Sequence, residues 1–193
     1  SAYSCALKSN GTLTCWGYNN LGQATPPAGS FTPPQVSAGL YHACAINSNG
    51  KLDCWGGNDY GQSTPSVAGT FAQVSAGSLH TCAIKSDGAV VCWGWNLYGQ
   101  STSPVEGTFV QVSAGAYHTC AIKSDGTLDC WGRNNYGQSD PPTGTFVQVS
   151  VFGDHSCAIR SSGTAACWGS NSSGQYLPLE PTFLQIAAGG YYT

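Results

Sequence analysis

Ten cysteines form five pairs, and the two members of every pair are ten residues apart. Paired thiols can form a disulfide, remain reduced in a core, or bind zinc. Zinc knuckles use much shorter spacings, whereas two cysteines that face each other across a β-hairpin need only a small twist to form a disulfide. We therefore predict five disulfides and keep buried free thiols as the alternative. The predicted pairs are Cys5–Cys15, Cys44–Cys54, Cys82–Cys92, Cys120–Cys130 and Cys157–Cys167.

Four histidines each lie two positions before the first cysteine of a pair, and four copies of one ligand type could suggest a metal site. They are His42, His80, His118 and His155. The alternative is one structural hydrogen bond for each histidine. Tyr3 and Tyr192 stand at the equivalent positions near the two ends of the chain, and a metal ligand would not be replaced so freely. We predict structural histidines, no metal site and no cofactor.

Sequence signatures of catalysis are missing. The chain has no G-x-S-x-G elbow, no H-E-x-x-H pair and no Gly-rich phosphate loop. Asp87 and Asp125 lie in Ser-Asp-Gly sequences, where turn formation explains them. We predict that the protein is not an enzyme and has no catalytic residues.

The cysteine pairs lie in a unit that recurs five times, and the first cysteines of successive units are 37 to 39 residues apart. Each unit joins a Phe-led segment, a stretch like C-A-I-K-S-D-G-T-L-D-C, and a W-G-x-N-x-x-G-Q element. The segments are short, β-prone and bounded by glycine, which predicts strands. Residues 123–127 are typical of a hairpin turn with glycine in the left-handed position, and this turn places Cys120 opposite Cys130. The predicted hairpin units are 5–23, 44–62, 82–100, 120–138 and 157–175.

Composition restricts the partners and the compartment. Charged residues make up 8% of the chain and the net charge is -3, so a nucleic-acid binder that neutralises phosphates is excluded. Apolar runs are only a few residues long, so we expect no membrane insertion. Five disulfides need an oxidising compartment, which is extracellular, at the cell surface or periplasmic, and we predict a secreted or cell-surface, extracellular protein. The chain begins with Ser and lacks Met, and we expect a mature or excised segment.

The stretch C-A-I-K-S-D-G-T-L-D-C-W-G-R-N-N-Y-G-Q, residues 120–138, resembles the regulator-of-chromosome-condensation repeat. The family form is A-L-x-x-x-G-x-x-x-x-W-G-x-N-x-x-G-Q preceded by G-x-x-H. All five units match its G-x-x-x-x-W-G-x-N-x-x-G-Q part, with Ala-Leu or Ala-Ile before it, and three units carry the preceding G-x-x-H. The resemblance implies a β-propeller with a four-stranded blade for each repeat, and a binding scaffold. Members include nuclear exchange factors, a plant photoreceptor and secreted β-lactamase inhibitor proteins, and this chain is most similar in style to the inhibitors. Its five units, against seven in well-known members, and its cysteines argue against nucleotide exchange.

The predicted fold is all-β, a single five-repeat propeller domain over residues 1–193. The chain begins at a cysteine hairpin without a Phe-led strand of its own, and the last Phe-led segment spans 183–189. We expect this segment to complete the first blade and close the ring. Residues 1–4 and 190–193 would then compete for one position. The array could instead continue in a longer chain, or the ends of two chains could meet.

Aromatic residues in loops are the candidate binding residues. Tyr41, Tyr117 and Tyr191 each precede a histidine position, and loop aromatics of this kind contact the partner in the inhibitors that the chain resembles. Phe152 and Asp154 are added because they break the repeat. Tyrosine offers a large rigid contact area and is enriched at interfaces, although ordinary rim packing is the alternative. A second aromatic row follows the tryptophans: Tyr18, Tyr60, Trp95, Tyr98 and Tyr136.

The leading functional hypothesis is a secreted, non-enzymatic scaffold that binds an unknown protein partner. One alternative is a structural subunit of an extracellular assembly that forms by self-association. A second is a carbohydrate-binding propeller lectin, because repeated Tyr and Trp near Asn, Gln and Asp can stack sugars. Two glycosylation sequons, at Asn10 and Asn171, fall in predicted loops and are candidate glycan sites.

Overall fold

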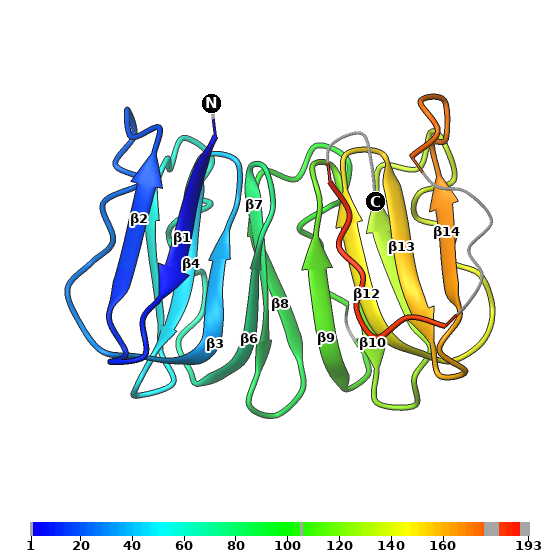
Figure 1. The fold of residues 1–193 in the computed structure, drawn as a ribbon, viewed down its shortest axis with the longest axis horizontal. Helices are drawn as coiled ribbons and strands as arrows, with labels where there is room; N and C mark the ends of the chain where they lie inside the picture. The colour runs from blue at the N-terminus through cyan, green and yellow to red at the C-terminus, as the bar shows by residue number, and fades with distance from the viewer. Residues whose placement is uncertain (1, 105, 176–181, 190–193) are drawn as a thin grey trace.

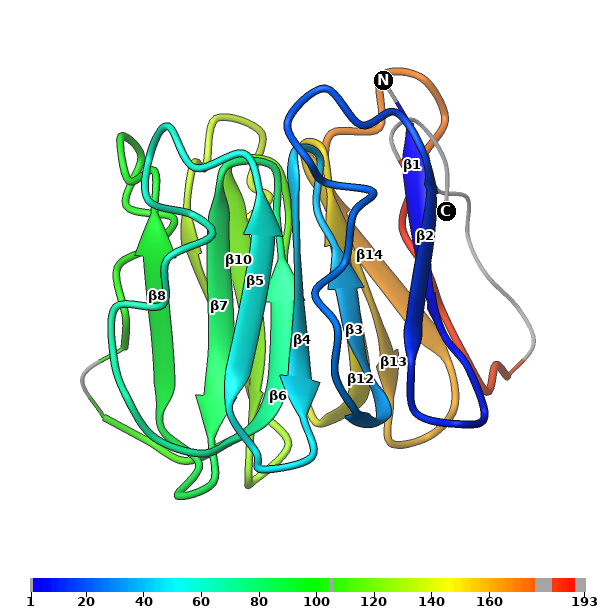
Figure 2. The same ribbon diagram turned by 90° about the vertical axis from the view of Figure 1, so that its left-hand side faces the viewer.

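The computed structural model describes residues 2–104, 106–175 and 182–189, and the side chains of 32–35 are left out of the description. These residues form antiparallel sheets that stand side by side along an arc (Figures 1 and 2). No helix in the described part of the chain has the length and apolarity needed to cross a membrane. The strands are β1 (Tyr3–Leu7), β2 (Leu13–Gly17), β3 (Phe31–Ala38), β4 (His42–Asn47), β5 (Leu52–Gly56), β6 (Phe71–Ala76), β7 (His80–Lys85), β8 (Val90–Gly94), β9 (Phe109–Ala114), β10 (His118–Lys123), β11 (Leu128–Gly132), β12 (Phe146–Phe152), β13 (His155–Arg160) and β14 (Ala165–Gly169).

Each sheet is one blade of the propeller. Blade 1 is the pair β1–β2, and blades 2 to 5 are the three-stranded sheets β3–β5, β6–β8, β9–β11 and β12–β14. The resemblance implied four strands for each blade, but the described residues form three at most. The segments that follow the outer strands contain proline, which has no N–H to donate to a sheet. These prolines are Pro26, Pro27, Pro65, Pro104, Pro141 and Pro142.

The hairpin register of every blade is the predicted one. In blade 4, Cys120 pairs with Cys130 and Ile122 with Leu128. The turn contains Gly126 at φ 85°, a conformation that costs other residues free energy. All five predicted cysteine pairs are disulfides, and the described residues include no free cysteine. The pairing thus follows from turn geometry in each repeat.

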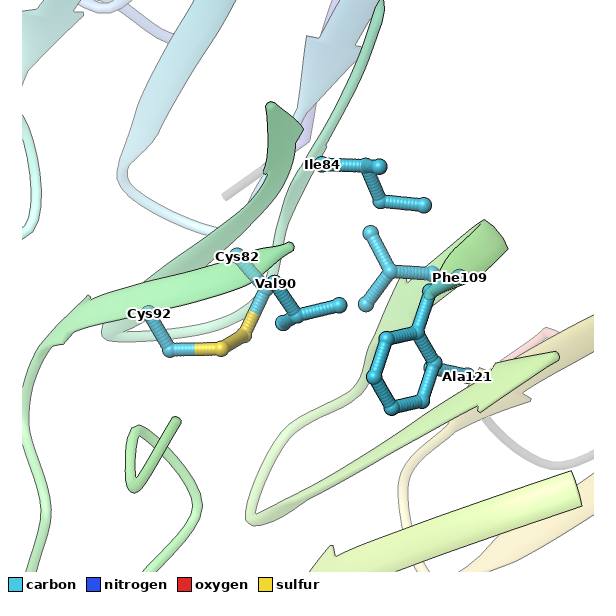
Figure 3. Packing of buried hydrophobic residues seen from close by; sticks show 7 residues of the cluster. Cys82, Ile84, Val90, Cys92, Phe109 and Ala121 are labelled. Carbon is cyan, nitrogen blue, oxygen red and sulfur yellow. A yellow bond between two sulfur atoms is a disulfide. The ribbon is translucent and has the colours of Figure 1, made fainter. Parts of the chain in front are cut away.

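The hydrophobic core lies between consecutive blades. Between blades 3 and 4, the Cys82–Cys92 disulfide, Ile84 and Val90 pack against Phe109 and Ala121 (Figure 3). The same combination recurs between blades 2 and 3 and between blades 4 and 5. Blades 3 and 4 therefore bury both of their faces, which explains why their strands carry bulky residues on both sides instead of an alternating pattern.

The innermost strands of neighbouring blades are linked through side chains. Gln73 accepts a hydrogen bond from Val112 N (2.7 Å) and donates one to Val112 O (3.2 Å). Ser75 Oγ accepts a hydrogen bond from Ala114 N (2.9 Å). Equivalent bonds join β9 to β12. These links hold the blades at a constant spacing.

Segment 182–189 occupies the inner-strand position next to blade 5. Gln148 bonds Ile186 through both N–H and O (2.9 Å each), and Ser150 Oγ accepts from Ala188 N (2.9 Å). In Figure 1 this segment lies beside β12, at the opposite end of the arc from β1. The predicted closure of blade 1 by 183–189 is therefore not shown. The hydrogen-bonding groups of the segment continue the arc instead, and β1 has only β2 as a sheet partner among the described residues.

Candidate binding face

The W-G-x-N-x-x-G-Q elements form rigid loops along one edge of the arc, where the outer strand of each blade ends. We call this edge the loop end. In blade 4, Asn134 Oδ1 accepts from Ser139 N (2.9 Å), and Gln138 Oε1 accepts from Tyr136 N (2.9 Å). The Gln138 side chain is fully buried, whereas Tyr136 is 54% exposed. The Asn and Gln side chains that recur in each loop thus fix the backbone, and the position between them, which differs from repeat to repeat, projects a side chain toward solvent.

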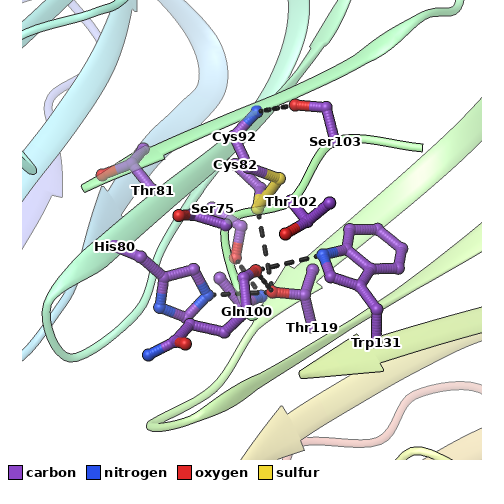
Figure 4. The surroundings of a disulfide bond; sticks show 12 residues. Ser75, His80, Thr81, Cys82, Cys92, Gln100, Thr102, Ser103, Thr119 and Trp131 are labelled. Atoms are coloured by element: carbon purple, nitrogen blue, oxygen red, sulfur yellow. Dashed lines mark hydrogen bonds between the residues drawn. A yellow bond between two sulfur atoms is a disulfide. The ribbon is translucent and has the colours of Figure 1, made fainter. Parts of the chain in front are cut away.

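Beneath these loops, a chain of polar contacts connects each blade to the next (Figure 4). The hydroxyl of Thr119 in blade 4 donates to Gln100 O (3.0 Å) and lies 2.9 Å from His80 Nε2 in blade 3. Trp131 Nε1 donates to the same Gln100 carbonyl (3.0 Å). Because the hydroxyl has one proton and gives it to the carbonyl, His80 Nε2 must be the donor in its contact.

Equivalent contacts recur at the neighbouring interfaces, between His42 and Thr81 (2.7 Å) and between His118 and Ser156 (2.7 Å). The first interface uses a different pair. Tyr3 replaces the histidine, its hydroxyl donates to His42 O, and Ala43 stands where the other blades have a hydroxyl.

These histidines are neutral structural groups. Burial lowers the pKa of His42 to about 4, and burial lowers the pKa of His80 and of His118 to about 3, because the charged form would lose its hydration. No group of three or more metal-ligating side chains occurs among the described residues. The arrangement links neighbouring blades through buried, neutral side chains.

Above this layer, five aromatic rings and one arginine form a continuous surface, which we call the aromatic face. It consists of Tyr60, Trp95, Tyr98, Tyr117, Tyr136 and Arg133. Trp95 lies 6.0 Å from Tyr60, 5.6 Å from Tyr98 and 5.7 Å from Tyr117, measured between ring centroids. Such tilted and edge-on contacts are favourable between aromatic rings.

Arg133 contacts three of the five rings of the aromatic face. Its guanidinium carbon is 5.8 Å from the Tyr98 centroid, 5.4 Å from Tyr117 and 5.7 Å from Tyr136, within the range of cation–π attraction. Its Nη1 is 3.2 Å from Asp154 Oδ1, and Gln138 Nε2 donates to the same oxygen (3.2 Å). The remaining five Lys and Arg residues lie at the hairpin turns of the blades, on the side of the molecule opposite the loop end. Arg133 thus anchors three rings and is itself neutralised by Asp154.

A groove of about 460 Å³ opens beside the aromatic face, and we call it the blade-5 groove. Tyr117 and Tyr136 of blade 4 line one part of it. Phe152, Asp154 and the loop that contains Ser170 and Ser173 line the part that belongs to blade 5. Its volume lies within the range of small-ligand pockets, ~300–1,000 Å³.

The structure brings three of the predicted rim residues together. Tyr117, Phe152 and Asp154 all line the blade-5 groove. Tyr41 does not line it; its carbonyl accepts a hydrogen bond from Gly57 N (2.8 Å) in blade 2. Tyr191 lies outside the described residues.

The two sequons lie at opposite ends of the arc. Asn10 is in the hairpin turn of blade 1, where its Oδ1 accepts a hydrogen bond from Thr12 Oγ1 (2.7 Å). Asn171 is in the loop that borders the blade-5 groove. Neither position is shown to carry a glycan.

Arg133 was not among the predicted site residues, although it contacts three rings of the aromatic face. The two aromatic rows were also predicted as separate sets, one before the histidines and one after the tryptophans. In the hairpin His118 pairs with Gly132, and just beyond this pair Arg133 N donates to Tyr117 O (2.9 Å), which brings the two rows together. The signal that could have found Arg133 is its position: it is the one Lys or Arg that does not lie at a hairpin turn.

Comparison with known proteins places these features in context. The structure of the receptor kinase CR4 ectodomain from Physcomitrella patens matches with a TM-score of 0.79 and 28% identity over 97% of this chain and 54% of that one. The CRINKLY WD40 ectodomain of the Arabidopsis thaliana receptor kinase ACR4 matches with a TM-score of 0.71 and 29% identity over 90% and 68%. This chain therefore spans about half of the moss ectodomain. No curated protein sequence matches it significantly.

More distant neighbours share the fold. Yeast RCC1 (Prp20), in its structure bound to Kap60, has a TM-score of 0.74 at 20% identity, with 88% of this chain and 54% of that one covered. The model of the "Regulator of chromosome condensation (RCC1) repeat" matches residues 1–23, 35–62, 71–100, 109–138 and 146–175. These five matches include every cysteine pair and every tryptophan loop, so the chain belongs to the RCC1 repeat family.

Proposed function

We propose that this chain is an extracellular, non-enzymatic scaffold that binds a protein partner through the aromatic face. The carrying observation is the cluster of rings around a neutralised arginine at the loop end, because Trp, Tyr and Arg dominate the binding energy of protein interfaces. Tyr60, Tyr98 and Tyr136 are 43–54% exposed. Their backbones are fixed by buried glutamines, so little conformational entropy is lost on binding.

The proposed location rests on two supports. Five disulfides are typical of proteins that fold in an oxidising compartment. Two of the structures that this chain resembles are ectodomains of receptor kinases. These relatives support a role in extracellular recognition and leave the partner of this chain to experiment.

A capture experiment with matched variants tests the proposal. Immobilised wild type, a Trp95→Ala/Tyr98→Ala double variant and a Val110→Thr/Val147→Thr control are each exposed to secreted and cell-surface proteins from the source organism. The control removes exposed apolar groups on inner strands β9 and β12, away from the loop-end rings. We expect a partner that binds wild type and control, with affinity for the double variant reduced at least about tenfold in the purified pair. Equal binding by all three proteins would refute the aromatic face as the recognition surface.

Self-association is the second candidate, because both ends of the arc expose apolar side chains. Trp16 of blade 1 is 56% exposed, whereas its equivalents Trp93 and Trp168 are 5% and 8% exposed and pack on a preceding blade. Leu184 is fully exposed beside blade 5. Sedimentation at micromolar concentration distinguishes the candidates: larger species that dissociate in a Trp16→Ser/Leu184→Ser variant would support assembly, and a monomer would oppose it.

A further inference from the structure

The blade-5 groove lies where one repeat departs from the others at several positions. Ser170 and Ser173 occupy the loop positions that are filled by Arg133 and Tyr136 in blade 4. The bulky row of the aromatic face therefore stops at blade 5 and leaves a hollow. Phe152 replaces the glycine that precedes the histidine by three residues in the other repeats and forms a wall of this hollow.

The change at Phe152 also alters the backbone. In blades 2, 3 and 4 the corresponding residues are Gly39, Gly77 and Gly115. Neighbouring blades approach closely at these glycines, since Leu40 N donates to Gly77 O (3.2 Å) and Ser78 N donates to Gly115 O (3.1 Å). In blade 5 the turn contains Gly153 at φ 54° instead, as in the two-residue hairpin turns that require glycine at their first position. This turn presents Phe152, 41% exposed, and Asp154 to the groove.

The groove contains one carboxylate, that of Asp154, whose position is fixed by hydrogen bonds. Oδ1 of Asp154 is held by Arg133 and by Gln138 at 3.2 Å each. No other described group bonds to Oδ2, so this oxygen can accept hydrogen bonds from a ligand. The loop that carries Ser170 and Ser173 begins beside Asp154, where Ser170 N donates to Asp154 O (2.8 Å), and the two serine hydroxyls supply both donors and acceptors to the groove.

We propose that the blade-5 groove binds a neutral saccharide. Exposed rings of Tyr136 and Phe152 can pack on the C–H faces of a sugar ring, while a fixed carboxylate and the serine hydroxyls exchange hydrogen bonds with its hydroxyl groups. A neutral ligand fits because Asp154 is the one charged residue that lines the groove and its charge is already balanced by Arg133. The groove shares Tyr117 and Tyr136 with the aromatic face, but saccharide binding does not depend on the protein-binding role proposed for that face.

The test uses the full chain, isotope-labelled and produced with intact disulfides in a host that does not attach N-glycans, so that Asn171 remains unmodified beside the groove. The probes are glucose, galactose, mannose, N-acetylglucosamine, cellobiose and chitobiose, added in turn to millimolar concentrations. At least one probe is expected to bind saturably, with amide shifts confined to the groove lining, at residues 116–117, 136, 152–154 and 170–175. No saturable binding by any probe, or shifts that lie elsewhere, would overturn the proposal.

Two variants restore the residue that other repeats carry, and both should therefore fold. Phe152→Gly removes the wall and is expected to weaken binding ~10-fold, the effect of about one lost ring contact. Ser173→Tyr refills the hollow and is expected to abolish binding. Tyr60→Ala removes the ring equivalent to Tyr136 two blades away, on the same end but outside the groove, and should leave binding unchanged. If Tyr60→Ala weakens binding as much as Phe152→Gly, or if neither restoring variant weakens it, the groove is not the site.

Discussion

The hydroxyl of Thr119 is expected to carry much of the stability of the interface between blades 3 and 4. Thr119→Val keeps the branched shape but removes the group between His80 Nε2 (2.9 Å) and Gln100 O (3.0 Å). Gln100 O retains its bond from Trp131 (3.0 Å), so the main loss is at the fully buried His80. A buried donor without a partner costs about 1–3 kcal/mol.

His80 has no alternative way to satisfy its donor. Its Nδ1 lacks a hydrogen-bond partner among the described residues, so a change of tautomer would only move the unpaired N–H. Burial lowers its pKa to about 3, so it does not gain a charge at neutral pH. We therefore expect Thr119→Val to reduce the free energy of unfolding by about 2 kcal/mol and the melting temperature by ~4–8 °C.

Urea and thermal unfolding of the oxidised protein at pH 7 measure this effect. The control is Thr108→Val, at an exposed threonine whose hydroxyl bonds the exposed Ser124 (2.7 Å), and its cost should remain below about 0.5 kcal/mol. Equal, small losses in both variants would show that the buried hydroxyl is not an energetic link between blades.

Three further outcomes are expected. The native pKa values of His42, His80 and His118 lie near 3–4, below the ~6.5 of an unfolded histidine. The contribution of these neutral histidines to the free energy of unfolding is therefore complete above pH ~6.5 and is lost as the pH falls toward ~4. Urea midpoints should drop over this window, and less steeply in His118→Gln. Replacing both Cys120 and Cys130 by Ala should cost about 2.5–3 kcal/mol in urea unfolding, and no loss of stability would contradict a role for this disulfide. Gly77→Ala should reduce the free energy of unfolding by ~3 kcal/mol, because the new Cβ would lie 2.4 Å from Gly115 O. The control Gly61→Ala places its Cβ where nothing lies within 4 Å and should cost only the ~1–2 kcal/mol of its positive φ. Similar melting temperatures for the two variants would refute the close approach.

The fold was predictable wherever one repeat contains all the information. The turn at Gly126 sets the register that places Cys120 opposite Cys130, and the two cysteines are only ten residues apart in the sequence. The closure of blade 1 was a different kind of inference, because it depends on the curvature of the whole array. Curvature follows from how one blade packs on the next, and no single repeat encodes it.

The candidate site shows the same division. Phe152 and Asp154 were identified because they break a local pattern, and both line the groove. Arg133 was missed because its role depends on contacts with Tyr98 in the preceding blade and Asp154 in the following one. A residue whose partners come from three repeats has no signature within its own.

The polar link between blades has an evolutionary consequence. Each interface is divided between two repeats, since one supplies a histidine and a carbonyl while the next supplies a hydroxyl and an indole. A unit such as blade 3 carries Thr81 and Trp93 for the blade before it and His80 for the blade after it. Duplication or deletion of such a unit leaves every contact matched, so arrays of this type can change length in whole blades. The Tyr3–Ala43 junction lacks this freedom, because Ala43 offers no hydroxyl to a histidine, and gene rearrangements should preserve those two repeats as neighbours.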